Sequence, residues 1–152
     1  MFDTRWMVLE DLPKVMFMSV NLIRRNPRKT MQAIQRLDNY AVMVLERHRE
    51  VVGYMLYKHH GDTVKIRQIC VMPDYRRKGG GTAMLQGLIE GYSKAEKPKP
   101  IEVTLPEDDF NTQSFLRKLG FKASGIKKEV FKKGDGYVFR YNFGQTAIKE
   151  KT

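Results

Sequence analysis

Cysteine and long apolar runs are both scarce in this chain. Cys70 is the single cysteine among 152 residues. One cysteine excludes an internal disulfide and is typical of a protein kept in the reducing cytoplasm. No uncharged apolar run approaches the roughly 20 residues of a membrane-spanning helix, and the N-terminus lacks the apolar core of a signal peptide. We therefore expect a cytoplasmic protein with no membrane partner.

Acidic residues are also few. The chain has 17 Asp and Glu against 28 Lys and Arg, which gives a formal net charge of +11. Such a surplus favours anionic ligands and allows contact with nucleic acid or a ribosome. Residues 117–152 alone hold ten Lys or Arg against three acids. A run of this kind is most often a solvated face without a partner, so both interpretations stay open.

The patterning of the chain predicts one α/β (α+β) domain over residues 1–143, followed by a flexible polar tail over 144–152. Asp11 is expected to cap the first helix, and Pro27 to begin the second. A third helix follows a glycine-rich segment, and a fourth is expected over 112–119. Strands are predicted over 4–9, 40–45, 51–59, 63–71, 101–105, 122–131 and 137–143.

The most informative segment runs from Val71 to Ala83. It leads from an apolar strand through Pro73 into three cations and three glycines, and then into a helix. Amides without side chains at the start of a helix can point at an anion, and the helix dipole and neighbouring cations add positive potential. A bare turn would not require three consecutive cations. The segment therefore predicts a pyrophosphate site.

Two familiar nucleotide motifs do not fit this spacing. A Walker loop requires Lys followed by Ser or Thr after its second glycine, but Thr82 and Ala83 follow Gly81. A dinucleotide fingerprint requires a third glycine where Met84 stands. The pattern that remains, Arg76-x-x-Gly79-x-Gly81, resembles the signature of the GNAT N-acetyltransferase superfamily. In that family this loop holds the pyrophosphate of acetyl-CoA.

A second segment strengthens the resemblance. Residues 115–121, Phe-Leu-Arg-Lys-Leu-Gly-Phe, are similar to the late helix of the family, with Gly120 where a left-handed helix end is wanted. The resemblance covers roughly residues 4–143 and is greatest to the ribosomal-protein alanine N-acetyltransferase branch, which acetylates protein N-termini. It implies the GNAT fold, with a mixed, mostly antiparallel central sheet of six to seven strands flanked by about four helices.

The resemblance also implies a reaction. Acetyl-CoA would be the cosubstrate, and the acceptor a primary amine that attacks directly in a ternary complex. A protein N-terminal α-amine is the expected acceptor, and a small amine such as a polyamine or aminoglycoside is the alternative. A non-catalytic acyl-CoA-binding or ribosome-docking module also stays open, as do a monomer and a homodimer.

By the same resemblance, the strand ending at Ile69, Cys70 and Val71 splays from its neighbour and offers backbone amides to the acyl and pantetheine groups. The N–H of Val71 would stabilise the developing oxyanion. Cys70 has no histidine near it in sequence, so we interpret its side chain as a small buried apolar one. The phosphates are assigned to Arg76, Arg77, Lys78, Gly79, Gly80, Gly81 and Thr82.

Glu102 is the candidate general base. It lies in Ile-Glu-Val, which resembles the segment where the N-terminal acetyltransferase branch keeps a glutamate base. A solvent-facing glutamate on an alternating strand is the plainer alternative. Asp109 stands where the family usually has an asparagine near CoA. With Glu107 and Asp108 it forms an acidic cluster, which would attract a cationic amine or stabilise the start of the next helix.

The general acid departs from the family pattern. Leu116 occupies the position where family members often place a tyrosine that protonates the CoA thiolate. Tyr141 is the candidate replacement, with Tyr137 or water as alternatives. His59 and His60 alternate faces of a strand and lack further ligands nearby, so no metal site is predicted.

Overall fold

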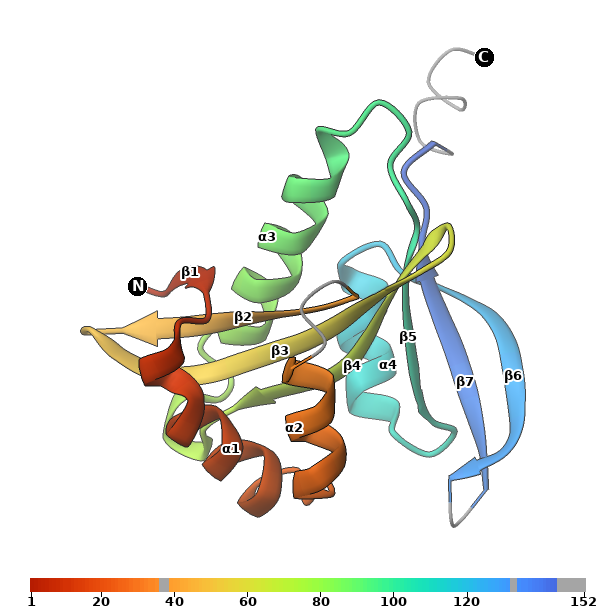
Figure 1. Cartoon of the computed structure of the whole chain (residues 1–152). Coiled ribbons are helices and arrows are strands. Elements are labelled where there is room, and N and C mark those ends of the chain that lie inside the picture. The colour runs from red at the N-terminus through yellow and green to blue at the C-terminus, as the bar shows by residue number, and fades with distance from the viewer. Residues whose placement is uncertain (36–38, 132–133, 145–152) are drawn as a thin grey trace. The chain divides into compact units, whose positions relative to one another are not determined.

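The computed structural model describes residues 1–35, 39–131 and 134–144. Within them lie four α-helices, namely α1 (Leu12–Asn21), α2 (Pro27–Gln35), α3 (Gly80–Ser93) and α4 (Phe110–Lys118), and two short 3-10 turns, η1 (Leu9–Asp11) and η2 (Pro73–Tyr75) (Figure 1). The strands are β1 (Asp3–Trp6), β2 (Tyr40–Arg47), β3 (Glu50–His60), β4 (Thr63–Val71), β5 (Ile101–Pro106), β6 (Lys122–Phe131) and β7 (Gly134–Tyr141).

The strands form one mixed sheet in the order β1-β2-β3-β4-β5-β7-β6. β4 and β5 pair in parallel, whereas β1–β2, β2–β3, β5–β7 and β6–β7 pair antiparallel. The predicted fold class, a mixed and mostly antiparallel sheet with helices, is confirmed. In the part of the chain described, no helix is long and apolar enough to cross a membrane.

The chain folds as two compact units. The first unit comprises Met1–His59 and Arg67–Leu88, and the second unit comprises His60–Ile66 and Ile89–Thr152. Strand β4 contributes residues to both. The single domain over residues 1–143 stays a prediction, and residues 145–152 of the expected tail lie outside the described residues.

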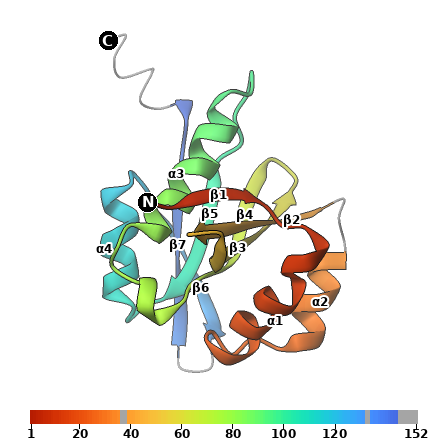
Figure 2. The same cartoon turned by 90° about the vertical axis from the view of Figure 1, so that its left-hand side faces the viewer.

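In the first unit, α1 and α2 lie on one side of β2 and β3, and α3 begins on the other side (Figure 2). Successive side chains of β2 point to these two sides in turn. Val42 and Val44 belong to a buried cluster with side chains from α1 and α2. Leu45, one residue further on, reaches toward the start of α3 at Gly80. The cluster on the α1 and α2 side consists of Val15, Met18, Ile34, Val42, Val44, Tyr54, Leu56 and Cys70.

Four polar side chains join the two N-terminal helices to the sheet of the first unit. Ser19 of α1 and Thr30 of α2 are buried, and their hydroxyl oxygens lie 3.0 Å apart. Gln68 of β4 donates to Thr30 at 3.0 Å, and its carbonyl oxygen accepts from the Tyr54 hydroxyl of β3. Burial raises the pKa of Tyr54 to about 12. These bonds satisfy polar groups that would be costly to bury alone.

The second unit packs α4 against the apolar face of β5 and β7. Ile101, Leu105 and Phe139 are buried, as is Leu116 of α4. The guanidinium carbon of Arg117 lies 5.2 Å from the centre of the Phe139 ring. This face therefore carries the core of the second unit.

The first strand is shorter than predicted. β1 ends at Trp6 instead of Leu9, because Leu9–Asp11 turn into η1. Asp11 stands at the N-cap position of α1 but makes no side-chain hydrogen bond to that helix. Its carboxylate accepts instead from the Val8 amide at 2.8 Å. The expected capping by Asp11 is therefore wrong, because a stronger partner takes the carboxylate.

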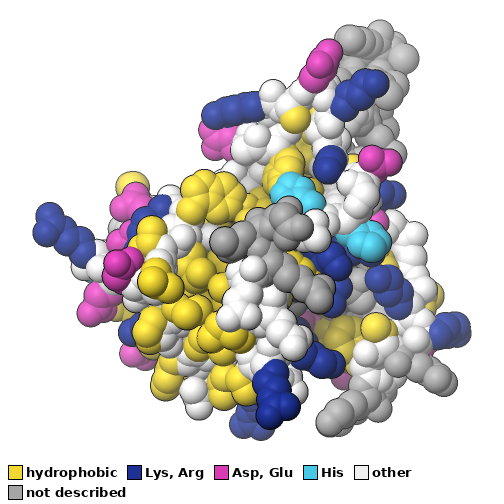
Figure 3. All heavy atoms as spheres, viewed as in Figure 1, with side chains coloured by type: hydrophobic (Ala, Val, Ile, Leu, Met, Phe, Trp, Pro, Cys, Tyr) yellow, Lys and Arg dark blue, Asp and Glu magenta, His cyan; other side chains and the backbone are white. Residues whose placement is uncertain are grey.

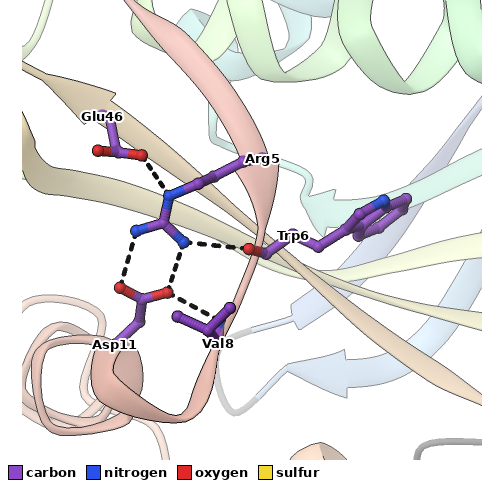
Figure 4. Close-up of polar contacts among 5 residues, drawn as sticks. All are labelled: Arg5, Trp6, Val8, Asp11 and Glu46. Carbon is purple, nitrogen blue, oxygen red and sulfur yellow. Dashed lines mark hydrogen bonds and ion pairs between the residues drawn. The ribbon is translucent and has the colours of Figure 1, made fainter.

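That partner is Arg5 (Figure 4). Its guanidinium donates to both carboxylate oxygens of Asp11, at 2.7 and 2.9 Å, and also to Glu46. A bidentate arginine–carboxylate pair is among the stronger polar contacts in proteins. It holds the turn after β1 against the strand, and the Arg5 hydrogen bonds lower the pKa of Asp11.

Hydrophobic side chains reach the surface near this turn. Figure 3 shows them gathered over α1. Trp6, Val8, Leu9 and Phe17 are each at least half exposed. The centre of the Trp6 ring lies 6.1 Å from the centre of the Tyr57 ring, so Trp6 still packs against an aromatic ring of β3.

We expect Asp11→Asn to lower the free energy of unfolding by about 1–3 kcal/mol, because Arg5 loses one of its two charged partners and keeps only Glu46. The folded-state pKa of Asp11 lies below its ordinary 3.8. Its stabilising contribution is therefore present above pH 3.8 and is lost as the pH falls through the lowered pKa. Urea denaturation between pH 2 and 7 measures this, and the variant should lose less stability in acid than wild type. Asp3→Asn, which changes an exposed acid of β1, is the control. Equal effects of the two changes would contradict the prediction.

Candidate active site

The glycine-rich segment of the first unit lies between β4 and α3, as predicted. β4 ends at Val71, and η2 (Pro73–Tyr75) turns the chain before α3 begins at Gly80. Between them the backbone enters the left-handed region twice, with φ of 60° at Arg77 and 90° at Gly79. Arg77 adopts its angle at a small energetic cost, whereas glycine adopts such angles freely, so Gly79 allows the strand to turn directly into the helix.

The first two glycines serve different purposes. A Cβ on Gly79 would meet nothing within 4 Å, whereas a Cβ on the buried Gly80 would lie 2.7 Å from Cδ2 of Leu45. Gly79 therefore faces open space, and Gly80 permits close packing of α3 on β2. The Gly79 carbonyl accepts the Ala83 amide at 2.9 Å, which is the first bond of the helix. The amides of Gly80, Gly81 and Thr82 thus stand in the first turn, where helix geometry offers no partner.

Arg76 ties this loop to the end of β4. Its Nε donates to the Val71 carbonyl at 2.8 Å. Arg76, Arg77 and Lys78 are all exposed, and Lys78 Nζ lies 6.0 Å from the centre of the Tyr75 ring. The loop therefore combines first-turn amides with three surface cations, a suitable environment for a phosphate.

The side chain of Cys70, next to the last residue of β4, points into the protein interior. Its side chain is buried, and burial raises the pKa of its thiol. Its backbone carbonyl would lie 2.7 Å from a Cβ on Gly53, so β3 approaches closely there. The interpretation of Cys70 as a small buried residue is confirmed. The splaying of β4 at Ile69 to Val71 and the oxyanion role of the Val71 amide stay predictions.

In the second unit, Glu102 has charged neighbours on both sides. Its Cα partner on β4 is Lys65, and its Cα partner on β7 is Arg140. Arg140 Nε lies 3.4 Å from Glu102 Oε2, and the Glu102 side chain is 18 % exposed. The carboxylate therefore faces cations across the sheet, although Ile101 and Val103 flank it along the strand.

Arg140 was not predicted as a partner of Glu102, because the sequence around Glu102 shows only its neighbours along β5. The alternation of β7 carries a signal, since Arg140 lies between the aromatic residues Phe139 and Tyr141 on the other face. Only the register of β5 with β7 shows which carboxylate Arg140 meets.

Tyr141 lies on the opposite face of β7 from Arg140. Its Cα partner is Ile101, so it also lies on the opposite face from Glu102. Its ring packs 5.5 Å from Phe121 and 5.0 Å from Phe143, measured between ring centres. Leu116, at the usual tyrosine position, is buried in α4 and carries no proton to donate.

Asp109 caps α4. Its Oδ1 accepts the Thr112 amide at 3.2 Å, which satisfies one of the first-turn donors of that helix. Its assignment to CoA stays a prediction. The acidic cluster was interpreted either as attracting a cationic amine or as stabilising the start of α4. The bond from Thr112 to Asp109 directly supports stabilisation of the helix by Asp109.

The sequence that carries these features matches the model of a known protein family. The model of the acetyltransferase (GNAT) family matches residues 6–121, which span the glycine loop, Glu102 and the turn after α4. The chain belongs to the acetyltransferase (GNAT) family. It is accordingly an acetyltransferase, as the resemblance of the two motifs implied. Curated protein sequences give no match to it.

Solved structures share its fold. The ribosomal-protein-S18-alanine N-acetyltransferase of Escherichia coli matches with a TM-score of 0.81 and 17 % identity, covering 93 % of each chain. Arabidopsis thaliana Naa50, in complex with the bisubstrate analogue CoA-Ac-MVNAL, has a TM-score of 0.78 and 18 % identity, covering 93 % of this chain and 99 % of that one. An Elizabethkingia anophelis GNAT acetyltransferase with acetyl-CoA bound has a TM-score of 0.74 and 15 % identity, covering 93 % and 97 %.

We expect Gly80→Ala to destabilise the chain by about 1–3 kcal/mol, because the added methyl group meets the buried Leu45. Gly91→Ala is the matched control in the same helix, since a Cβ there meets nothing within 4 Å. It should stabilise by about 0.5–1 kcal/mol through helix propensity alone. Thermal unfolding of both variants measures this, and stabilisation by Gly80→Ala would refute the packing role.

Proposed function

We propose that this acetyltransferase uses acetyl-CoA as cosubstrate and transfers the acetyl group to a primary amine, the α-amine of a protein N-terminus. The observation that carries the proposal is the start of α3, where Gly79 leaves open space beside first-turn amides and three exposed cations. The donor set fits a pyrophosphate, because amides and cations both stabilise anionic oxygen.

Candidate groups are present both for holding acetyl-CoA and for stabilising its carbonyl oxygen during attack. Acetyl-CoA, when bound, supplies a thioester that is already activated for attack. Residues Arg76 to Thr82 hold its phosphates, and the Val71 amide donates to the carbonyl oxygen as negative charge develops there. Ile69 and Cys70 contribute backbone groups to the same strand end, and Asp109 is a further candidate contact.

Glu102 is the proposed general base, which takes the proton of the acceptor ammonium directly or through one water. Its contact with Arg140 fixes the carboxylate on one face of β5. Tyr141 is the proposed proton donor for the departing thiolate. Glu102 and Tyr141 lie on opposite faces of the sheet, so these two roles require the amine to approach the reacting carbon from one face and the thiolate to leave toward the other.

The N-terminal α-amine is favoured over a small amine by the Ile-Glu-Val segment around Glu102 and by residues 115–121. Solved structures with related folds include one that carries an acetylated peptide joined to CoA. The basic surface also permits contact with nucleic acid or a ribosome, as the net charge of +11 suggests.

Binding of the cosubstrate is tested by thermal unfolding. Acetyl-CoA at about 100 times its dissociation constant should add about 2.7 kcal/mol of stability, which raises Tm by several degrees. Gly79→Ala should abolish this shift, because the methyl group enters the open space and strains the loop. Gly61→Ala is the matched control, since Gly61 also has positive φ and no neighbour within 4 Å of a Cβ. A normal shift in the Gly79 variant would reject the loop as the phosphate site.

Turnover is tested by release of free CoA thiol with N-terminal peptides, polyamines and aminoglycosides. Glu102→Gln should lower kcat/KM by roughly a hundredfold, the lower range for general base catalysis, while leaving the acetyl-CoA thermal shift intact. Glu90→Gln, on the exposed surface of α3, is the control. Unchanged turnover in the Glu102 variant would reject its role as base. Turnover with small amines alone would replace the N-terminal acceptor by the small-amine alternative.

A further inference from the structure

Glu102 lies within a row of charged residues that crosses four strands of the second unit. Lys65 of β4 is the Cα partner of Glu102, Glu102 is the partner of Arg140, and Arg140 is the partner of Lys122 on β6. Partners directly across neighbouring strands point to the same face of a sheet. The order across the sheet is therefore Lys65, Glu102, Arg140, Lys122.

The charges of this row do not cancel. Arg140 and Glu102 form an ion pair at 3.4 Å, so their opposite charges offset each other. Lys65 and Lys122 remain on either side and leave a net charge of about two positive units. Neighbouring strands lie roughly 4.8 Å apart, so the backbone of each lysine lies about 5–10 Å from the backbone of Glu102. Both lysine side chains are at least partly exposed and can reach solvent on this face.

The acidic cluster after β5 does not neutralise the row. Glu107 is five residues beyond Glu102, which corresponds to roughly 16 Å along an extended strand. That separation exceeds the Debye length of about 8–10 Å at physiological salt. Asp109 is further occupied as the cap of α4. The net charge around the Glu102–Arg140 pair is therefore set by the two lysines.

We propose that Lys65 and Lys122 make the acceptor site select amines with a carboxylate close to the reacting nitrogen. This inference rests on the proposed role of Glu102 as base. An acceptor that carries further cations, such as a polyamine, would be repelled by the row. A carboxylate beside the α-amine would be attracted, whether it belongs to an acidic second residue of a peptide or to a free amino acid.

The test compares three hexapeptides that differ only at the second residue, Ala-Glu, Ala-Gln and Ala-Lys, together with free alanine, by thiol release at low salt. We expect kcat/KM for the Glu peptide to exceed that for the Lys peptide by about tenfold, with the Gln peptide between them. The reason is that Lys65 and Lys122 each attract the Glu side chain of one peptide and repel the Lys side chain of the other. The ratio should shrink at 0.5 M salt. Acetylation of free alanine in addition to the Glu peptide would assign recognition to any nearby carboxylate, and its absence would assign recognition to the peptide side chain.

Lys65→Met and Lys122→Met should each lower the Glu-to-Lys peptide ratio by about two- to threefold. Lys127→Met is the matched control, because Lys127 lies on the same strand as Lys122 but pairs with Gly136, four residues from Arg140 along β7. Since the ratio compares two substrates of one enzyme, a general loss of activity does not alter it. A wild-type preference for the Lys peptide, or ratios unaffected by both lysine changes, would overturn the inference. A wild-type chain that releases no thiol with any amine would overturn the proposed function itself, and this inference with it.

Discussion

The period of two along a β-strand is the constraint on which both faces of the second unit depend. On β5, Ile101 and Leu105 point into the core against α4, and the residue between Ile101 and Val103 must then point the other way. Glu102 is placed by that rule, and the register with β7 brings Arg140 to meet it. A slip of β5 by one residue would turn the Glu102 carboxylate into the core and its apolar neighbours toward the other face.

A second constraint acts in the first unit, where a strand must become a helix within a few residues. The left-handed backbone at Arg77 and Gly79 makes that change of direction. It leaves the first-turn amides of α3 at the end of β4, and the bond from Arg76 to the Val71 carbonyl fixes the loop against the strand. Preorganisation of this kind lowers the entropy lost when an anion binds.

Local signals allowed much of this to be predicted. β4 was expected over 63–71 and has those ends, because a Gly-Asp turn precedes it and a proline follows. Asn26 and Pro27 were expected to begin α2, and the Asn26 side chain accepts the Arg28 amide at 2.9 Å. The glycine loop and the turn at Gly120 were recognised because their residues are close together in sequence.

What escaped prediction depends on residues distant in sequence. Asp11 was expected to cap a helix, yet its carboxylate accepts hydrogen bonds from Arg5 of β1. The pairing of β1 with β2 also brings Glu46 to the same guanidinium. The partners of Glu102 lie on β4 and β7, so no local pattern reveals them. The placement of Ser19, Thr30 and Gln68 in one buried network likewise requires the tertiary fold.

The burial of Cys70 has a practical consequence for the enzymology of this chain. A thiolate attacks a disulfide reagent and displaces one of its sulfurs, and a buried thiol with a raised pKa supplies little thiolate. Colour formed by such a reagent in a turnover measurement therefore reports liberated coenzyme instead of the protein. The same residue becomes reactive when the core beneath α1 and α2 opens, so its labelling rate in the absence of substrate would report how often that core is breached.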